Sequence, residues 1–150
     1  MRNFILFAML LTMFQRTAVA VNQVHNMAHA IAKAEGFERK GTIPSRYHNP
    51  GDLKSIKGYR YPGQVGIGKG GHVIFRNDEA GWAALEHQIE KIKAGTSRYS
   101  VNMTLREFGK RYAGNWRIWS KNVAHNLGVN PQAYLWECLG IAPALETAWL

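Results

Sequence analysis

Apolar residues recur with the period of an α-helix in five segments of this 150-residue chain, and with the pattern of a strand in one. The five segments are bounded by capping residues or glycines and lie near residues 22–35, 77–94, 104–114, 115–127 and 130–140. Residues 37–71 are rich in turns and glycine, and the best strand, residues 72–76, follows them directly. This order predicts one α+β domain, mainly helical, with a small β-hairpin lobe and a cleft between the lobes.

The first twenty residues have the pattern of a cleaved targeting segment. Arg2 gives a positive start, residues 4–14 are apolar except for Thr12, and residues 18–20 (Ala-Val-Ala) supply small side chains for cleavage. The apolar run is shorter than the roughly 20 residues of a membrane span. We therefore expect residues 1–20 to be a signal peptide and residues 21–150 to be the mature domain. The protein would be exported to the periplasm or extracellular space, with no stable membrane insertion after leader removal. The alternative is a buried N-terminal helix.

The net charge is +9, and it falls to +7 when Arg2 and Arg16 leave with residues 1–20. Such a charge suits an anionic partner such as nucleic acid, anionic lipid or a bacterial wall polymer. The basic residues are scattered and match no DNA-reading helix or RNA-binding motif, so no nucleic-acid partner is expected. The single cysteine, Cys138, excludes an internal disulfide and lies in an apolar stretch that predicts a buried thiol.

Glu35 is the most informative residue of the sequence. It falls on the apolar face of the first helical segment, in its last turn, directly before Gly36 and Phe37. Partial burial and the negative end of the helix dipole both disfavour a charged carboxylate and raise its pKa. An acid that stays protonated near neutral pH can protonate a leaving oxygen, as glycosidic cleavage requires. The alternative is a structural ion pair with Arg39 or Arg46.

Two stretches around Glu35 carry a resemblance to a known family. They are residues 31–37 (IAKAEGF) and 46–53 (RYHNPGDL), and a strand-helix pair follows at residues 73–84. In this order they resemble the lysozyme-like superfamily of phage and bacterial wall enzymes, and the resemblance covers most of residues 22–140. It implies a lysozyme-like fold and cleavage of the β-1,4 bond between N-acetylmuramic acid and N-acetylglucosamine in peptidoglycan glycan strands. Glu35 would be the general acid, and no cofactor or metal is expected.

The same resemblance suggests substrate-binding residues. Arg46, Tyr47 and Asn49 are expected to bind substrate, because they lie in or beside the Asn-Pro-Gly-Asp turn. Soluble lytic transglycosylases usually have Glu-Ser and a Gly-Leu-Met-Gln motif, whereas this chain has Glu35-Gly36 and lacks that motif. Their Ala-Tyr-Asn-Ala-Gly motif is matched loosely by residues 111–115 (RYAGN), so Tyr112 is either a partner near Glu35 and the substrate or a core tyrosine.

A second carboxylate decides the mechanism, and Asp52 is the candidate. Hydrolases pair the acid with another carboxylate whose separation sets inversion or retention. The alternative is an Asx-type role for Asp52 in closing the turn at residues 49–52. Without a second carboxylate, a lytic mechanism remains, in which the sugar's own 6-hydroxyl attacks and leaves an anhydro product. The sequence leaves hydrolase and lytic transglycosylase open, and the oligomeric state unknown.

Several other features have two interpretations. His25 and His29 have i, i+4 spacing, but two ligands do not make a metal site and a solvated helix face is favoured. The glycines of residues 66–71 favour a hairpin over a phosphate-binding loop. Trp116 and Trp119 either stack on sugars or pack in the core. The alternative function is a non-catalytic wall-binding or assembly protein with a lysozyme-like fold. An exported nuclease that uses His48 is disfavoured, because no coherent metal set accompanies it.

Overall fold

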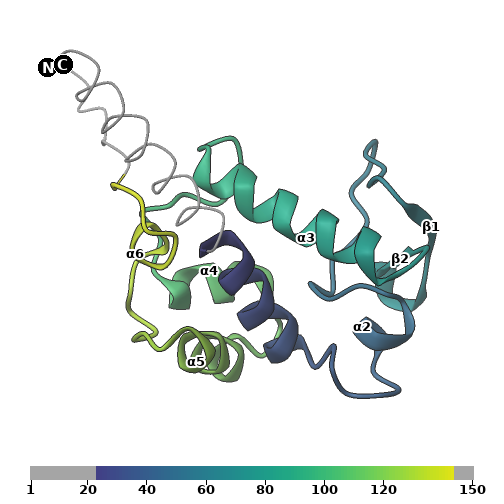
Figure 1. Ribbon diagram of the computed structural model, residues 1–150, viewed down its shortest axis with the longest axis horizontal. Coiled ribbons are helices and arrows are strands. Elements are labelled where there is room, and N and C mark those ends of the chain that lie inside the picture. The colour runs from purple at the N-terminus through teal and green to yellow at the C-terminus, as the bar shows by residue number, and fades with distance from the viewer. Residues whose placement is uncertain (1–22, 144–150) are drawn as a thin grey trace, which may run out of the picture.

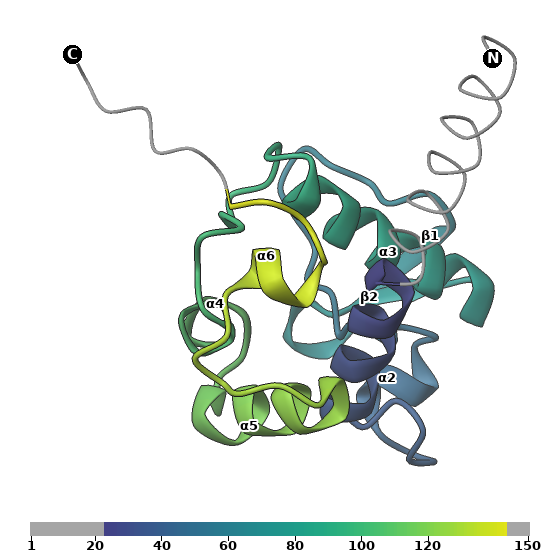
Figure 2. The same ribbon diagram turned by 60° about the vertical axis from the view of Figure 1, so that its left-hand side comes forward.

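The computed structural model describes residues 23–143 and has an α+β architecture, as the sequence predicts (Figure 1). A helix over residues 23–35 and α3 (Asp78–Lys93) occupy the middle of the molecule. On one side lie α4 (Leu105–Tyr112), α5 (Trp116–Leu127) and α6 (Leu135–Cys138), and on the other lie α2 (Ile43–Arg46), β1 (Gln64–Ile67) and β2 (Val73–Phe75) (Figures 1 and 2). The expected signal peptide and the Asn22 cap lie outside the described residues.

The first helix ends at Glu35, as predicted, through a Schellman motif. Gly36 has a φ of 77° and donates its N–H to the carbonyl of Lys33, while the N–H of Phe37 bonds to Ala32. Glycine is required here for its conformation, because a side chain rarely adopts this positive φ. This helix end therefore fixes the backbone position of Glu35.

The hairpin predicted around the glycine cluster is confirmed. β1 and β2 pair antiparallel, with Gln64 opposite Phe75 and Ile67 opposite Val73, and an irregularity between Gln64 and Gly66. A short 3₁₀ turn, η1 (Lys69–Gly71), connects the two strands. An isolated bridge between Lys54 and His72 extends the sheet beyond β2 and places these two side chains together.

The Asn49-Pro50-Gly51-Asp52 turn is held from inside by Asn49. This side chain is fully buried, and its amide nitrogen donates to the carbonyls of Leu53 and Val73, both at 2.9 Å. Its amide oxygen accepts from the Leu53 N–H at 2.8 Å. A Cβ on Gly51 would lie 2.7 Å from Leu85, so the turn packs closely against α3. Asn49 thereby joins the turn to β2.

The helix caps follow the local signals of the sequence. The side chain of Asn77 accepts from the Ala80 N–H, and Asp78 occupies the first turn of α3 as expected. Thr104 and Glu107 form the predicted capping box at the start of α4. These two caps set the directions of the helices that line the site described below.

The last predicted helix starts later than the sequence indicates, and the prediction of Asn130 as its cap is wrong. The Asn130 side chain accepts from the Gln132 N–H within a turn, and α6 begins only at Leu135. The first amide groups of α4 bond to the carbonyls of Pro131 and Ala133, which are thereby withheld from a helix. The short α2 was not predicted either, although Thr42 caps it and proline occupies its first turn.

A single hydrophobic cluster joins the first helix, α3, α4, α5 and α6. Its largest fully buried side chains are Phe75, Phe108, Met27, Ile31, Leu85, Ile89, Leu105, Leu135 and Leu139. Cys138 is buried as predicted, and burial raises the pKa of its thiol to about 11, so the thiolate is scarce at neutral pH. No helix among residues 23–143 combines the length and hydropathy that a bilayer crossing requires.

Candidate active site

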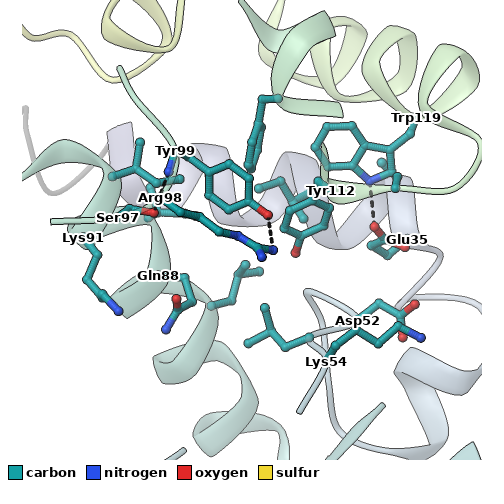
Figure 3. A pocket seen from close by; sticks show the side chains of 18 of the residues that line it. Glu35, Asp52, Lys54, Gln88, Lys91, Ser97, Arg98, Tyr99, Tyr112 and Trp119 are labelled. Atoms are coloured by element: carbon teal, nitrogen blue, oxygen red, sulfur yellow. Dashed lines mark hydrogen bonds between the residues drawn. The ribbon is translucent and has the colours of Figure 1, made fainter. Parts of the chain in front are cut away.

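A cavity of about 710 Å³ contains the acid predicted from the sequence (Figure 3). Residues 52–56 line one part of it, α4 and α5 line another, and the second half of α3 lines a third. Glu35 and Asp52 are the two carboxyl groups among the described residues that line it. Elements from both sides of the molecule thus contribute to one cavity.

Glu35 lies at the wall of this cavity with its carboxyl group bonded to Trp119. The indole Nε1–H of Trp119 donates to Oε1 of Glu35 at 2.7 Å, across 84 positions of sequence. The pKa of Glu35 is raised to about 7, chiefly by burial and also by the nearby charge of Asp52, although the Trp119 bond and Lys54 oppose the rise. Glu35 is therefore substantially protonated at neutral pH, as expected of a general acid.

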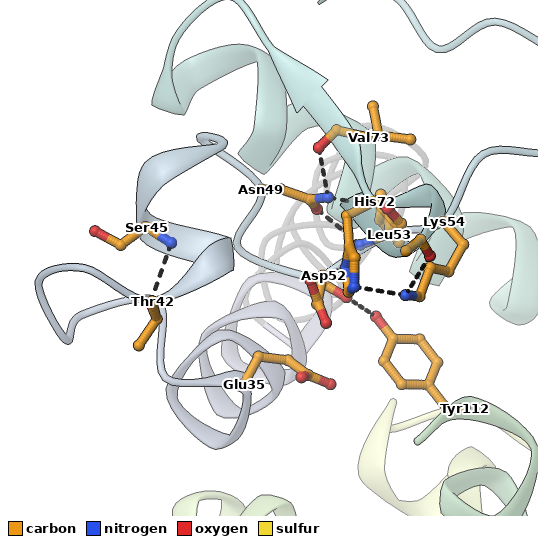
Figure 4. Close-up of polar contacts among 12 residues, drawn as sticks. Glu35, Thr42, Ser45, Asn49, Asp52, Leu53, Lys54, His72, Val73 and Tyr112 are labelled. Atoms are coloured by element: carbon orange, nitrogen blue, oxygen red, sulfur yellow. Dashed lines mark hydrogen bonds and ion pairs between the residues drawn. The ribbon is translucent and has the colours of Figure 1, made fainter. Parts of the chain in front are cut away.

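Asp52 is held by a chain of side-chain hydrogen bonds from the hairpin (Figure 4). His72 Nδ1 lies 2.5 Å from Asp52 Oδ1, and Lys54 Nζ lies 2.6 Å from His72 Nε2 and 2.9 Å from the Gly70 carbonyl. Because an ammonium group only donates, Nε2 of His72 accepts and Nδ1–H donates to the carboxylate. The chain therefore fixes both the orientation of the imidazole ring and the oxygen of Asp52 that it contacts.

The backbone of Asp52 is also in an uncommon conformation. Its φ of 48° lies in the left-handed region, which a residue other than glycine adopts infrequently. The turn is closed by the Asp52 N–H, which bonds to the Asn49 carbonyl at 2.9 Å, while the Asp52 side chain bonds to His72. The carboxylate is thus directed away from the turn and toward the cavity.

The charge of Asp52 acts on Glu35. Burial raises the pKa of Asp52, and the His72 contact and Lys54 oppose that rise. The charge of Asp52 in turn favours the protonated form of Glu35. The cavity therefore holds an acid with a raised pKa and a second carboxyl group whose charge His72 and Lys54 favour against the effect of burial.

Tyr112 lies between Trp119 and the turn. Its hydroxyl donates to the Gly51 carbonyl at 2.5 Å, and its ring lies 5.0 Å from the Trp119 ring and 5.1 Å from Phe108. Burial raises the pKa of Tyr112 well above its ordinary value, and the charge of Glu35 adds to that rise, so the hydroxyl stays protonated. Tyr112 connects α4 to the residue that precedes Asp52.

The other residues suggested for substrate binding lie outside this cavity. Asn49 is fully buried and uses its amide within the turn. The guanidinium of Arg46 lies over the Tyr47 ring at 5.7 Å, and the Tyr47 ring packs directly against Gly68. The structure therefore brings Glu35, Asp52 and Tyr112 together, and places Arg46, Tyr47 and Asn49 elsewhere.

Three participants were not identified from the sequence. Trp119 was predicted either to stack on sugars or to pack in the core, and its helical spacing with Val123 gives no sign of its bond to Glu35. His72 and Lys54 are 18 positions apart in the sequence, and the isolated β-bridge between these two residues brings them together. The sequence offered one signal for His72: a polar residue begins the predicted strand directly before the apolar Val73, which is buried.

Metal ligation finds no support in the described part of the chain. His25 bonds to Glu86 at 2.9 Å, and no cluster of three or more potential ligand side chains occurs within residues 23–143.

A comparison with models of known protein families, with curated proteins and with solved structures finds no match.

Replacing Tyr112 with phenylalanine tests its connection to the turn. We expect Tyr112→Phe to lower the free energy of unfolding by about 1 kcal/mol, because one partly buried hydrogen bond is lost. The turn that carries Asp52 would loosen, so a reaction that depends on Asp52 should show a severalfold lower kcat with little change in KM. Chemical denaturation and steady-state kinetics measure both quantities, with Tyr134→Phe as the exposed control. A rise in KM at unchanged kcat would instead indicate direct substrate contact.

Proposed function

We propose that this protein cleaves the β-1,4 bond between N-acetylmuramic acid and N-acetylglucosamine in peptidoglycan, in a lysozyme-like cleft, with Glu35 as the general acid. One observation carries the proposal. Glu35 is a carboxylic acid with a pKa of about 7, at the wall of a cavity that a second carboxylate also lines. Such a pair in a cavity of about 710 Å³ suits a glycan substrate.

The first step is proton transfer from Glu35 to the glycosidic oxygen. As the C1–O bond breaks, its electron pair stays with the leaving oxygen, which takes the Glu35 proton, and positive charge develops on the sugar ring. Trp119 then stabilises the product carboxylate, because its indole N–H remains bonded to Oε1. The same bond orients the carboxyl group before the reaction.

The second step belongs to Asp52. Its carboxylate lies on the cavity side of the turn and stabilises the developing positive charge. When water attacks C1, Asp52 then accepts a proton of that water; when the 6-hydroxyl of the same sugar attacks instead, its proton goes back to the Glu35 carboxylate. In the reaction with water, the proton given up by Glu35 and the proton gained by Asp52 balance, and exchange with solvent resets both groups. The bonds from His72 and Lys54 keep Asp52 in place through this exchange.

The charge of the chain agrees with this substrate. A net charge of +9 over 150 residues favours association with an anionic wall polymer. The resemblance of residues 31–37 and 46–53 to lysozyme-like enzymes leads to the same class of substrate.

Mass analysis of fragments released from purified peptidoglycan tests the proposal. We expect muropeptides with cleaved muramyl bonds. A reducing end identifies water as the attacking group, and a 1,6-anhydro end identifies the internal hydroxyl. The control is Glu35→Gln protein at the same concentration. If intact folded protein binds the polymer and releases no fragments over a range of pH values, the non-catalytic wall-binding alternative is the better account.

A further inference from the structure

The cavity continues well beyond the two carboxyl groups. Figure 3 shows Lys91, Gln88 and Ser97 at the opposite end from Glu35, with Arg98 reaching from that end toward Tyr112. We call Gln88, Lys91, Ser97 and Arg98 the donor end of the cavity. Gln88 and Lys91 come from the last turns of α3, and Ser97 and Arg98 come from the loop that follows.

The donor end has hydrogen-bonding capacity that the protein does not use. The side-chain amide nitrogen of Gln88 is buried and has no hydrogen-bond partner within the described part of the chain. A buried donor without a partner costs free energy, and rotation of the Gln88 side chain toward a bound acceptor in the cavity recovers it. This orphaned amide is the observation that indicates a ligand.

The charged side chains that line the donor end are both positive. Lys91 and Arg98 line it, and the two carboxyl groups that line the cavity, Glu35 and Asp52, lie at its other end. One guanidinium nitrogen of Arg98 donates to the Tyr99 hydroxyl at 2.7 Å, and the guanidinium lies 4.9 Å from the Tyr99 ring centroid. These contacts hold the group in place and leave further N–H donors free for a ligand. An ammonium, a guanidinium and an amide N–H together match an anionic oxygen ligand.

We propose that the donor end binds a carboxylate on the lactyl-peptide substituent of the glycan, and so selects muramyl polymers over neutral ones. This inference rests on the proposed function, because it assumes that a glycan lies across Glu35 and Asp52. N-acetylmuramic acid differs from N-acetylglucosamine by a lactyl ether that ends in a carboxylate or continues into a stem peptide with carboxylates of its own. A neutral chitin strand offers no such group.

The test separates binding from turnover. Binding is measured by calorimetry in the Glu35→Gln background, with three soluble tetrasaccharides: chitotetraose, a peptide-free muramyl glycan, and the same glycan with stem peptides. The Lys91→Gln/Arg98→Gln pair should weaken binding of the carboxylate-bearing ligands about tenfold or more, because charge-assisted bonds are lost. Binding of chitotetraose should stay the same. Weaker binding of the peptide-free glycan identifies the lactyl carboxylate as the bound group. Weaker binding of the peptide-bearing glycan alone identifies a carboxylate of the stem peptide.

A matched control removes the effect of overall charge. Lys40→Gln/Lys121→Gln takes away the same two positive charges from exposed positions that do not line the cavity. An equal loss in this control, an equal loss with chitotetraose, or no loss at all would each overturn the inference. Gln88→Leu should reproduce part of the effect without any change in charge. Because binding is read without turnover, absence of cleavage by the wild-type protein would refute the proposed function and leave this result standing.

Discussion

Glu35→Gln is expected to abolish most cleavage of peptidoglycan while the chain stays folded and bound to it. Glutamine has the size of glutamate and can still accept the Trp119 hydrogen bond, but it has no proton to deliver. General acid catalysis contributes roughly 10²–10⁴-fold, so kcat should fall by about that factor. In the wild-type protein, kcat/KM should decline as pH rises through about 7, where Glu35 loses its proton.

The same substitution should stabilise the protein at alkaline pH. The folded-state pKa of Glu35 is raised from 4.5 to about 7, so wild-type stability is lost as pH rises from the unfolded to the folded value. Glutamine does not ionise and avoids this cost, which corresponds to about 3 kcal/mol at pH 8. We expect Glu35→Gln to be more stable than wild type at pH 8, with the difference vanishing near pH 4.

Chemical denaturation at both pH values and fragment release on one preparation check this pair of expectations. Glu38→Gln, an exposed substitution three residues away, is the control and should change neither quantity appreciably. If Glu35 were a structural ion-pair partner, Glu35→Gln would destabilise the protein at pH 8 and leave fragment release largely intact. That result would refute the proposed acid.

The features of the fold that local signals determine were predictable from the sequence. Glu35 ends its helix because Gly36 adopts a left-handed conformation that ends helices, and Thr104 starts α4 through a capping box. The start of α6 was not predictable in this way. Asn130-Pro131 has the composition of a helix start, but α4 uses the carbonyls of residues 131 and 133. That competition is tertiary and leaves no trace in the local sequence.

In the site, too, the features that depend on local sequence were predictable and those that depend on tertiary contacts were not. The position of Glu35 on an apolar helix face was sufficient to predict its raised pKa, because burial is the dominant cause. Its hydrogen-bond partner lies 84 positions away and has the spacing of a core residue. Asn49 was expected at the substrate because of the motif around it, yet its amide is consumed in holding the turn to β2. Motif membership did not separate residues that shape a site from residues that face it.

Asp52→Asn is expected to lower kcat by about two orders of magnitude or more, since electrostatic stabilisation and proton acceptance at one group each contribute on that scale. Asparagine keeps the shape of the side chain and can still accept from His72 Nδ1–H, so the turn should be preserved. The negative charge beside Glu35 disappears, and because that charge raises the pKa of Glu35, the pKa should fall. The alkaline limb of the residual activity should therefore move to lower pH.

A pH profile of kcat/KM for wild type and Asp52→Asn, with Asp78→Asn as a control outside the cavity, separates three roles. A lower kcat/KM at every pH, together with a shift of the alkaline limb of the profile, supports Asp52 as a second catalytic carboxylate. Near-normal activity at acid pH with only the limb shifted means that Asp52 acts through its charge on Glu35, and the proton acceptor proposed here is wrong. An unchanged profile with lowered stability means that Asp52 only forms the turn, and a lytic reaction driven by Glu35 becomes the remaining mechanism for this cavity.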